Sequence, residues 1–384
     1  MKKIIYFDNA ATTRVHPEVF NSMTPYFCDE YANPAGAYKN AVIADKAINR
    51  SRVQASRLIG ARPDEIYFTS GGSESDNWAI KSYSRNVRRM QKGASCHIIT
   101  TSIEHNAVIN SCRTLEAEGF AVTYVPCDKY GFIRPETVQS AIRDDTILIS
   151  VMAANNEVGT IQPLKMIGQI AHRHQIAFHT DAVQAYGHIP INVNECMIDM
   201  LSMSAHKLKG PKGTGFLYVR NGLELPAYID GGSQENGHRA GTSNVPGIVG
   251  LGKACEIAAR NMSRNINNMT RLRNRIIYKI KKGLPDAVLT GSEQMRLPNN
   301  ISFCFPHVES SQLLAILDMH GICASAGSAC STGAAGPSHV LIAMGINPEL
   351  AGGSLRLTIS DETTIEEADY VADTVIKTVK KLRI

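Results

Sequence analysis

Residues 146–152 read TILISVM, residues 177–180 read AFHT, and residues 200–204 read MLSMS. Each run is short and rich in apolar or β-branched residues, which is typical of a buried β-strand. Between the first two runs, Leu164 to His174 has the pattern of an amphipathic helix. Strands that alternate with helices predict a mainly parallel sheet with helices on its faces. This part of the sequence therefore indicates the α/β fold class.

The same alternation continues on both sides of these runs. We expect residues 15–260 to form a large domain whose mainly parallel sheet has seven strands covered by helices. After about Gly252 the pattern changes to a long charged helix that runs to about Lys282, and then to a second α/β region. Residues 1–14 and 261–384 are expected to form this smaller α/β domain. The four other predicted strands are Ile66 to Thr69, His97 to Ser102, Ala121 to Pro126 and Thr214 to Val219.

The composition favours a globular protein that acts on a small molecule. The 384 residues are 43% hydrophobic and 20% charged, so the chain can bury a full core. The net charge of +5 is spread along the chain, and its densest basic runs, Arg85 to Lys92 and Arg271 to Lys282, are typical of solvated helix faces. We therefore expect no direct binding to nucleic acid. No uninterrupted apolar run is long enough to cross a bilayer, so we expect no membrane contact.

The cysteines and the N-terminus bear on the compartment. Nine cysteines are scattered without a CxxC pair, which fits neither a disulfide framework nor a zinc ribbon. Met1 to Phe7 is a short strand-like run followed by Asp8, which is not the pattern of a signal peptide. These features predict a cytoplasmic protein without a metal site, in which most thiols are small core residues. We expect such packed thiols at Cys96, Cys127, Cys196, Cys304 and Cys323.

Polar residues directly follow four of the predicted strands. Ordinary loop polarity would explain any one of these groups. Four in succession, each at the edge where such sheets bind ligands, predict an active site. The groups are Glu104-His105-Asn106, Asn155-Asn156-Glu157, Asp181, and Ser204-Ala205-His206-Lys207.

Lys207 is a candidate for covalent binding of a cofactor. It lies just past a predicted strand and beside the rigid run Gly210-Pro211-Lys212-Gly213, where its amine could form a Schiff base with a carbonyl cofactor. A surface lysine is the alternative. By spacing alone, Lys209 and Lys212 are rival candidates.

Two neighbouring segments could hold other parts of the same cofactor. Asp181 could pair with a protonated pyridine nitrogen, although a helix N-cap is the alternative and the two roles can coexist. Thr69-Ser70-Gly71-Gly72-Ser73-Glu74 joins a strand to a helix, and its small residues and hydroxyls could cradle a phosphate. A tight turn with a capping serine would have the same sequence.

The segment from Ala324 to Gly336 consists almost entirely of alanine, glycine and serine around Cys330. With so little to pack, it is expected to be mobile and to expose that thiol, so Cys330 is a candidate nucleophile. Arg356, in a strand-like run near the end, could clamp a substrate carboxylate with two parallel hydrogen bonds. A surface salt bridge is the alternative for Arg356.

Taken in order, these segments closely resemble the cysteine desulfurase family (NifS/IscS type), which are class V, fold-type I enzymes that use pyridoxal 5'-phosphate (PLP). The resemblance covers essentially the whole chain. The matching stretches are Tyr6 to Thr13, Phe68 to Asn77, Glu104-His105, Asn155-Asn156-Glu157, Asp181 to Gln184, Ser204 to Gly213, Arg239 to Thr242, Ser325 to Cys330, Pro337 to Leu341, and Arg356.

The resemblance implies a role for each candidate in holding the cofactor ring. Lys207 would carry the Schiff base and act as an acid and base. Asp181 would face the pyridine nitrogen, while Gln184 and Asn156 would contact the ring hydroxyl. His105 would stack on the ring and assist proton transfer.

The resemblance also implies which residues would bind the phosphate of the cofactor. Gly72, Ser73, Ser204 and His206 would hold the phosphate, and Thr242 would reach in from the second subunit of a homodimer.

The resemblance also implies the reaction. Arg356 and Asn156 would bind the L-cysteine substrate. The thiolate of Cys330, in a mobile segment of about residues 324–337, would attack the sulfur, which releases L-alanine and leaves a persulfide. An acceptor protein, such as an iron–sulfur scaffold or a thiolation enzyme, would then take that sulfur.

Some positions depart from the family pattern and leave the acceptor open. Ala35 to Tyr38 replace the serines and histidine of relatives, Asn236 replaces an arginine, and Ser243 and Gly336 each replace a glutamate. The chain ends at Ile384, without the longer tail that some relatives use to dock an iron–sulfur scaffold.

Two alternatives stay open at this point. The first is another class V PLP enzyme, such as a selenocysteine lyase or an aminotransferase, in which Cys330 is optional. The second is a non-catalytic binding protein built on the same fold.

Overall fold

The computed structural model describes residues 4–327 and 336–383. All seven predicted strands form one sheet in the order β2-β8-β7-β6-β5-β3-β4, which confirms the α/β fold class. Only β8 runs antiparallel to its neighbours. The bounds are β2 Ile66–Thr69, β3 His97–Thr101, β4 Ala121–Val125, β5 Thr146–Ser150, β6 Ala177–Asp181, β7 Met200–Ser204 and β8 Gly215–Val219.

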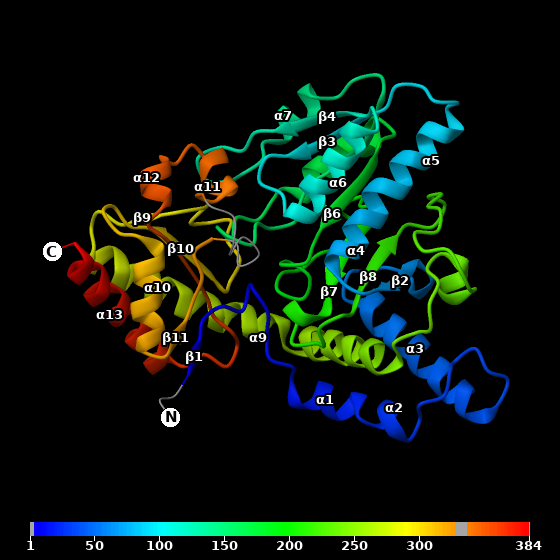
Figure 1. The fold of residues 1–384 in the computed structure, drawn as a ribbon, viewed down its shortest axis with the longest axis horizontal. Coiled ribbons are helices and arrows are strands. Elements are labelled where there is room, and N and C mark those ends of the chain that lie inside the picture. Colours follow the sequence, from blue (N-terminus) through cyan, green and yellow to red (C-terminus); the bar gives the residue numbers. More distant parts are fainter. Residues whose placement is uncertain (1–3, 328–335, 384) are drawn as a thin grey trace.

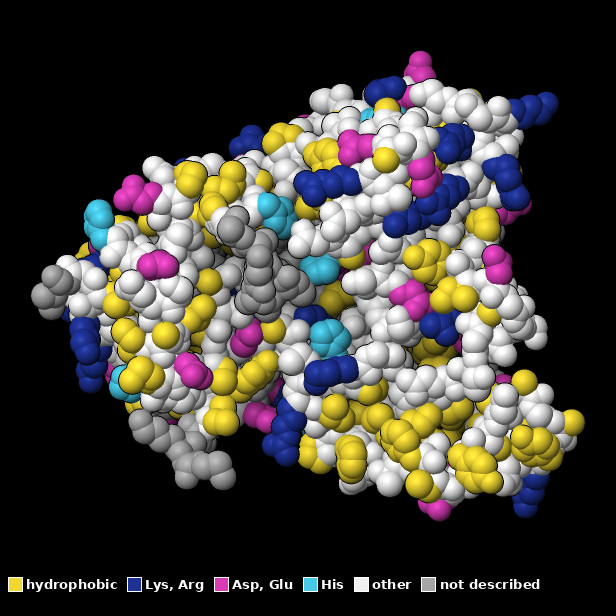
Figure 2. Space-filling model, viewed as in Figure 1, with side chains coloured by type: hydrophobic (Ala, Val, Ile, Leu, Met, Phe, Trp, Pro, Cys, Tyr) yellow, Lys and Arg dark blue, Asp and Glu magenta, His cyan; other side chains and the backbone are white. Residues whose placement is uncertain are grey.

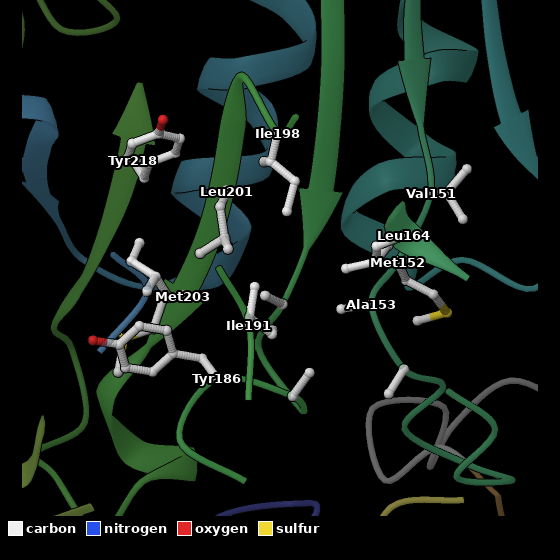
Figure 3. Close-up of a cluster of buried hydrophobic side chains, with 14 of the residues drawn as sticks. Val151, Met152, Ala153, Leu164, Tyr186, Ile191, Ile198, Leu201, Met203 and Tyr218 are labelled. Atoms are coloured by element: carbon white, nitrogen blue, oxygen red, sulfur yellow. The ribbon is translucent and has the colours of Figure 1, made fainter. Parts of the chain in front are cut away.

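Helices cover this sheet (Figure 1). The buried residues of these helices lie on one apolar face, which packs on the sheet. In α8 (Leu164–Arg173), the residues at positions 164, 167, 168, 170 and 171 are buried, which is the spacing of one helix face. Figure 3 shows Leu164 of α8 in the same buried cluster as Leu201 and Met203 of β7. The other helices before β8 are α1 Pro17–Met23, α2 Pro25–Cys28, α3 Lys39–Arg57, α4 Gly72–Asn77, α5 Tyr83–Met90, α6 Asn106–Ala117 and α7 Pro135–Ser140.

The long helix α9, Val245–Gly283, connects the two parts of the protein (Figure 1). It begins earlier than predicted because Asn244 caps it by accepting a hydrogen bond from the Gly247 amide. Its first half is buried in the core of the large sheet, and its second half in a separate apolar cluster drawn from residues 5–7 and 269–379.

Two small sheets accompany that second cluster. β1 (Ile5–Tyr6) pairs in parallel with β11 (Ile322–Cys323). In a second, antiparallel sheet, β10 (Asn300–Cys304) lies between β12 (Ser354–Thr358) and β9 (Val288–Leu289). The division into residues 15–260 and the remainder stays a prediction. The remaining helices are α10 Ser310–Met319, α11 His339–Ala343, α12 Pro348–Ala351 and α13 Ile365–Leu382.

The topology gathers polar loops at one edge of the large sheet. Because β8 is the only antiparallel strand, the other six strands all end at the same edge. Gly215, which starts β8, packs so closely on the turn after β2 that a Cβ atom there would lie 2.7 Å from the Gly71 Cα. This glycine contact holds the turn after β2 against the end of β7. None of the described helices is both long enough and apolar enough to span a membrane.

Candidate active site

A cavity with an empty volume of about 760 Å³ opens at this edge of the sheet. Of the twelve residues that the sequence predicts for the site, ten line this cavity: Gly72, Ser73, His105, Asn156, Asp181, Gln184, Ser204, His206, Lys207 and Arg356. The other two are Thr242, which lies elsewhere, and Cys330, which lies outside the described residues.

Lys207 is the lysine that the structure brings into the cavity. It ends a single helical turn, Ala205–Lys207, directly after β7, and its Nζ donates to the carbonyl oxygens of Ala10 at 2.6 Å and Ala11 at 2.7 Å. The rival Lys209 turns to the surface and pairs with Glu362 at 2.8 Å. The geometry therefore selects Lys207 over Lys209, which spacing alone could not do.

Asp181 ends β6 and is buried at the cavity floor. Its Oδ1 accepts a hydrogen bond from the Val183 amide at 2.9 Å in a turn, and no described helix begins there, so the helix N-cap alternative is wrong. Burial raises the pKa of Asp181, while His105 and Lys207 favour its charged form. A buried carboxylate beside two basic groups is suited to face a cationic ring nitrogen.

A second buried carboxyl, Asp76 of α4, was not predicted from the sequence. One side-chain atom from each of Asp76, His105 and Asp181 lies within 4.8 Å of the other two. Burial, followed by the nearby Asp181, raises the pKa of Asp76 well above its usual value. Asp76 lies three residues after Ser73 and therefore on the same helix face, which is the signal that could have identified it.

A third buried carboxyl, Glu104, lies behind this pair. Its Oε1 accepts hydrogen bonds from the Thr101 hydroxyl at 2.8 Å and the Met152 amide at 2.9 Å. Burial raises the pKa of Glu104 to about 8. The His179 ring lies between the Ser150 hydroxyl at 2.8 Å and the Ser202 hydroxyl at 3.0 Å. Burial lowers the pKa of His179 to about 3, so the ring is neutral.

These values predict a pH-dependent stability. Because the pKa of Glu104 is raised, the folded protein favours its protonated form, so this stabilisation is complete below pH 4.5 and is lost as the pH rises to about 8. Over that interval the free energy of unfolding should decrease by roughly 2–4 kcal/mol from this group. Urea unfolding at several pH values should show a weaker decrease in Glu104→Gln, because glutamine does not ionise. The exposed Glu136→Gln is the matched control, and equal slopes in all three proteins would contradict the prediction.

The turn after β2 forms a cradle of small residues at the mouth of the cavity. Gly71 has a φ of +152°, which favours glycine, and a Cβ atom at Gly72 would lie 2.6 Å from the Val183 Cγ2 atom. Gly72, Ser73 and Ser204 line both the cavity and an adjoining hollow of about 680 Å³. Backbone amides and hydroxyls grouped in this way suit a phosphate.

His206 borders the same hollow and is held neutral. Its Nδ1 lies 3.0 Å from the Thr12 hydroxyl. Burial and the nearby Lys207 lower the pKa of His206 to about 4. A neutral imidazole can donate one hydrogen bond to a phosphate while its other nitrogen faces Thr12.

The stretch from Asp8 to Ala11 lies at the cavity wall and contacts several of its functional groups. Besides the hydrogen bond from Lys207, the Ala10 carbonyl accepts one from the side-chain amide Nε2 of Gln184 at 3.0 Å. This stretch resembles the family in sequence, but no role was predicted for Asp8, which forms an ion pair with Arg356. The Arg356 side chain is only 2% exposed, and its Nη2 donates to the Asp8 Oδ1 at 2.8 Å. The surface salt bridge expected as the alternative for Arg356 is therefore wrong, because this ion pair is buried in the cavity wall.

His105 and Asn156 complete the wall. His105 caps α6, and its Nδ1 accepts the Ala107 amide at 3.1 Å, which fixes the ring at the cavity. The Asn156 carbonyl accepts a hydrogen bond from Arg356 at 3.3 Å. Thr242 is exposed in a separate hollow of about 420 Å³, so within one chain it does not reach the cavity.

The described residues on either side of the Cys330 segment contact this site. Before it, the Ser325 hydroxyl donates to the Asp8 Oδ2 at 2.8 Å. After it, the Ser338 hydroxyl donates to the Glu157 carboxylate. The five predicted packed cysteines are buried or half-buried, and burial raises the pKa of each.

Together, a lysine amine, a buried carboxyl pair, a glycine-rich turn and a buried arginine around one cavity are typical of an enzyme that acts on a small molecule. Comparison with known proteins agrees with this. The family model described as Aminotransferase class-V matches residues 5–371. Cysteine desulfurase IscS of Methanosarcina thermophila is 49% identical over 381 residues, which cover 99% of this chain and 93% of that protein. Cysteine desulfurase of Mus musculus is 44% identical and covers 99% of this chain and 82% of its own.

Solved structures give the same result. The structure of a NIFS-like protein superposes with a TM-score of 0.91 at 36% identity, covering 99% of this chain and all of its own. A structure described as SspA in complex with cysteine has a TM-score of 0.81 at 37% identity, covering 95% of this chain and all of its own. The chain belongs to the class-V aminotransferase family. Within that family it is a cysteine desulfurase.

Proposed function

We propose that this cysteine desulfurase binds PLP through Lys207 and transfers the sulfur of L-cysteine to Cys330. The observation that carries the proposal is the position of the Lys207 amine in the same cavity as Asp181 and the buried Arg356. An amine that can hold an aldehyde, a carboxylate for a ring nitrogen and a guanidinium for a substrate carboxylate are the three groups that such a reaction requires.

The residues present fit PLP. At the cradle, a side chain on Gly72 would collide with Val183, so only glycine fits there, and Gly71, Gly72 and Ser73 line the hollow where a phosphate could lie. The Asp76 Oδ1 is buried and has no hydrogen-bond partner among the described residues. A buried polar atom of this kind indicates that the oxygen carries a proton or meets a group bound in the cavity. Ser73, Ser204 and His206 supply further hydrogen-bonding groups beside the cradle.

The chemistry divides between the cofactor and the protein. When bound, PLP supplies an electron-withdrawing ring that weakens bonds near the substrate amine. Lys207 holds the cofactor at Nζ and moves protons, Asp181 keeps the ring nitrogen cationic, and His105 assists proton transfer. Gln184 and Asn156 contact the ring hydroxyl.

Substrate binding and sulfur transfer use the remaining groups. Arg356 and Asn156 bind the carboxylate of L-cysteine. The Cys330 thiolate attacks the substrate sulfur, so one S–S bond forms and the C–S bond breaks with a proton delivered to carbon. The products are L-alanine and a Cys330 persulfide, and no external oxidant is needed. The complex of SspA with cysteine supports L-cysteine as the substrate.

The proposal predicts a fixed stoichiometry. With excess L-cysteine and a thiol reductant, the PLP-loaded protein should form L-alanine and sulfide in equal amounts, because each turnover cleaves one C–S bond. Alanine can be measured by chromatography and sulfide by a colorimetric assay. Pyruvate in place of alanine would indicate an elimination reaction. Turnover only with selenocysteine would indicate a selenocysteine lyase.

We also propose that two copies assemble and that Thr242 acts in the partner's site. Exposed apolar side chains gather over α1, α2 and the start of α3, on the lower right of Figure 2, and a patch of this kind supports a protein interface. Arg239, close to Thr242 in sequence, pairs with Glu74 of the phosphate cradle at 2.9 Å and holds this loop near the cradle. The exposed apolar residues are Phe20, Phe27, Tyr31, Tyr38 and Val42.

The acceptor and the compartment are also part of the proposal. We infer that an acceptor protein, either an iron–sulfur scaffold or a thiolation enzyme, takes the persulfide sulfur. The described cysteines are all free thiols, which supports a reducing compartment, and we propose the cytoplasm.

A further inference from the structure

Asp8 bonds to two groups that lie far apart in the sequence. Its Oδ1 accepts from the Arg356 Nη2 at 2.8 Å, and its Oδ2 accepts from the Ser325 hydroxyl at 2.8 Å. Arg356 and Ser325 are themselves paired through their backbones, since the Arg356 amide donates to the Ser325 carbonyl at 2.6 Å and the Ser325 amide donates back at 3.2 Å. The Asp8 carboxylate therefore links Arg356, which is proposed to bind the substrate, to its backbone partner Ser325.

Phe7, the residue before Asp8, is held by backbone hydrogen bonds to two strands. The Phe7 amide donates to the Cys323 carbonyl at 2.9 Å, and the Thr358 amide donates to the Phe7 carbonyl at 2.6 Å. The segment around Asp8 therefore lies between β11 and β12. A carboxylate on such a supported segment can fix a long side chain in one orientation.

The hydrogen bonds of Arg356 show what this orientation achieves. A guanidinium has five N–H donors. The structure shows side-chain bonds to Asp8 and to the Asn156 carbonyl, while the Nε is buried without a hydrogen-bond partner among the described residues. Because Arg356 lines the cavity, donors remain for an incoming carboxylate.

We propose that Asp8 is a positioning residue that orients the Arg356 guanidinium for the substrate carboxylate and fixes Ser325 with its second oxygen. This inference rests on the proposed role of Arg356. Asp8 neutralises the buried arginine before substrate binds and leaves its free N–H groups directed to the cavity. Its negative charge also weakens the attraction of Arg356 for a second carboxylate, so position and charge act in opposite directions.

Two substitutions separate these effects. Asp8→Asn keeps an acceptor for Arg356 and can donate to the Ser325 hydroxyl, so the orientation is kept while the competing charge is removed. Asp8→Ala removes both contacts. The probes are L-alanine and ethylamine, which differ only in the carboxylate, and their binding to the PLP-loaded enzyme is followed by the change in cofactor absorbance.

We expect Asp8→Ala to weaken L-alanine binding about tenfold, because a hydrogen-bonded charged group loses its orientation. Asp8→Asn should bind L-alanine about twofold tighter than the wild type or more, because a competing charge is gone. Ethylamine binding should stay the same in both variants. Hydrogen exchange in the peptide that covers residues 322–327 should be faster in Asp8→Ala and unchanged in Asp8→Asn. Asp369→Ala, which removes the ion pair between α13 and Arg275 of α9, is the matched control and should change none of these values.

Equal weakening of L-alanine and ethylamine in both Asp8 variants would show a merely structural role and overturn the inference. Wild-type L-alanine binding in Asp8→Ala would overturn it too. Arg356→Gln distinguishes these results from a failure of the proposed function. If Arg356→Gln has the same ratio of L-alanine affinity to ethylamine affinity as the wild type, Arg356 does not bind the carboxylate. The proposed role of Arg356 and the inference about Asp8 would then both fail.

Discussion

Replacing Lys207 with alanine should remove the visible absorbance of the PLP-loaded protein and reduce alanine formation from L-cysteine by about 10³-fold or more. The effect should be large because the amine has two tasks. It holds the cofactor covalently, and it moves protons during the reaction. The structure supports Lys207 in both, since its Nζ lies in the cavity against the carbonyls of Ala10 and Ala11. Absorbance spectra and chromatographic measurement of alanine test the two tasks separately.

Lys209→Ala is the matched control. Lys209 is two residues away, but it pairs with acidic side chains at the surface, so this variant should retain its colour and most of its activity. A coloured, active Lys207→Ala protein together with a colourless Lys209→Ala protein would show that the wrong lysine was assigned. A wild type that never acquires colour with PLP would support a binding protein without catalysis.

Replacing Cys330 with serine should reduce sulfide release under reductant by about 10²- to 10³-fold while the cofactor absorbance is retained. A serine hydroxyl cannot accept the sulfur as a persulfide, but the binding of PLP and of the substrate carboxylate does not depend on Cys330. The absorbance change caused by L-alanine should therefore be that of the wild type. Sulfide and alanine measured in the same samples would show this separation.

Cys28→Ser and Cys323→Ser control for the loss of any thiol. Cys28 is an exposed thiol, and Cys323 is a half-buried thiol near the site. Together they test whether exposure alone or nearness to the site alone affects sulfide release. Both variants should release sulfide at nearly the wild-type rate. Unimpaired release by Cys330→Ser would remove Cys330 from the mechanism and favour a class V enzyme in which this thiol is optional.

The large sheet was predictable because each strand is a short apolar run between polar turns. β2 and β7 have the predicted bounds, and the other five strands differ by one or two residues at an end. The early start of α9 was not predictable from hydrophobic spacing, because it depends on the Asn244 cap and on packing against a distant core. Local pattern therefore predicted the strands better than it predicted the end of a helix that joins two cores.

The site was predictable where its residues follow a strand or lie in a distinctive turn, as Asp181, Lys207 and Gly72 do. Spacing could not distinguish Lys207 from Lys209, and only the fold or the family resemblance does so. Asp8 was missed because its partner Arg356 lies 348 positions later. Asp76 was missed because an acidic residue in a polar helical segment reads as exposed, whereas the fold buries it against Asp181.

The most direct test of the central claim is the mass of the peptide that contains Cys330 after a brief exposure of the PLP-loaded protein to L-cysteine without reductant. That peptide should gain one sulfur atom, the gain should disappear on adding a thiol, and the Lys207→Ala protein should show none. An unchanged Cys330 peptide, with alanine formed and the extra sulfur on another cysteine or in solution, would contradict the account.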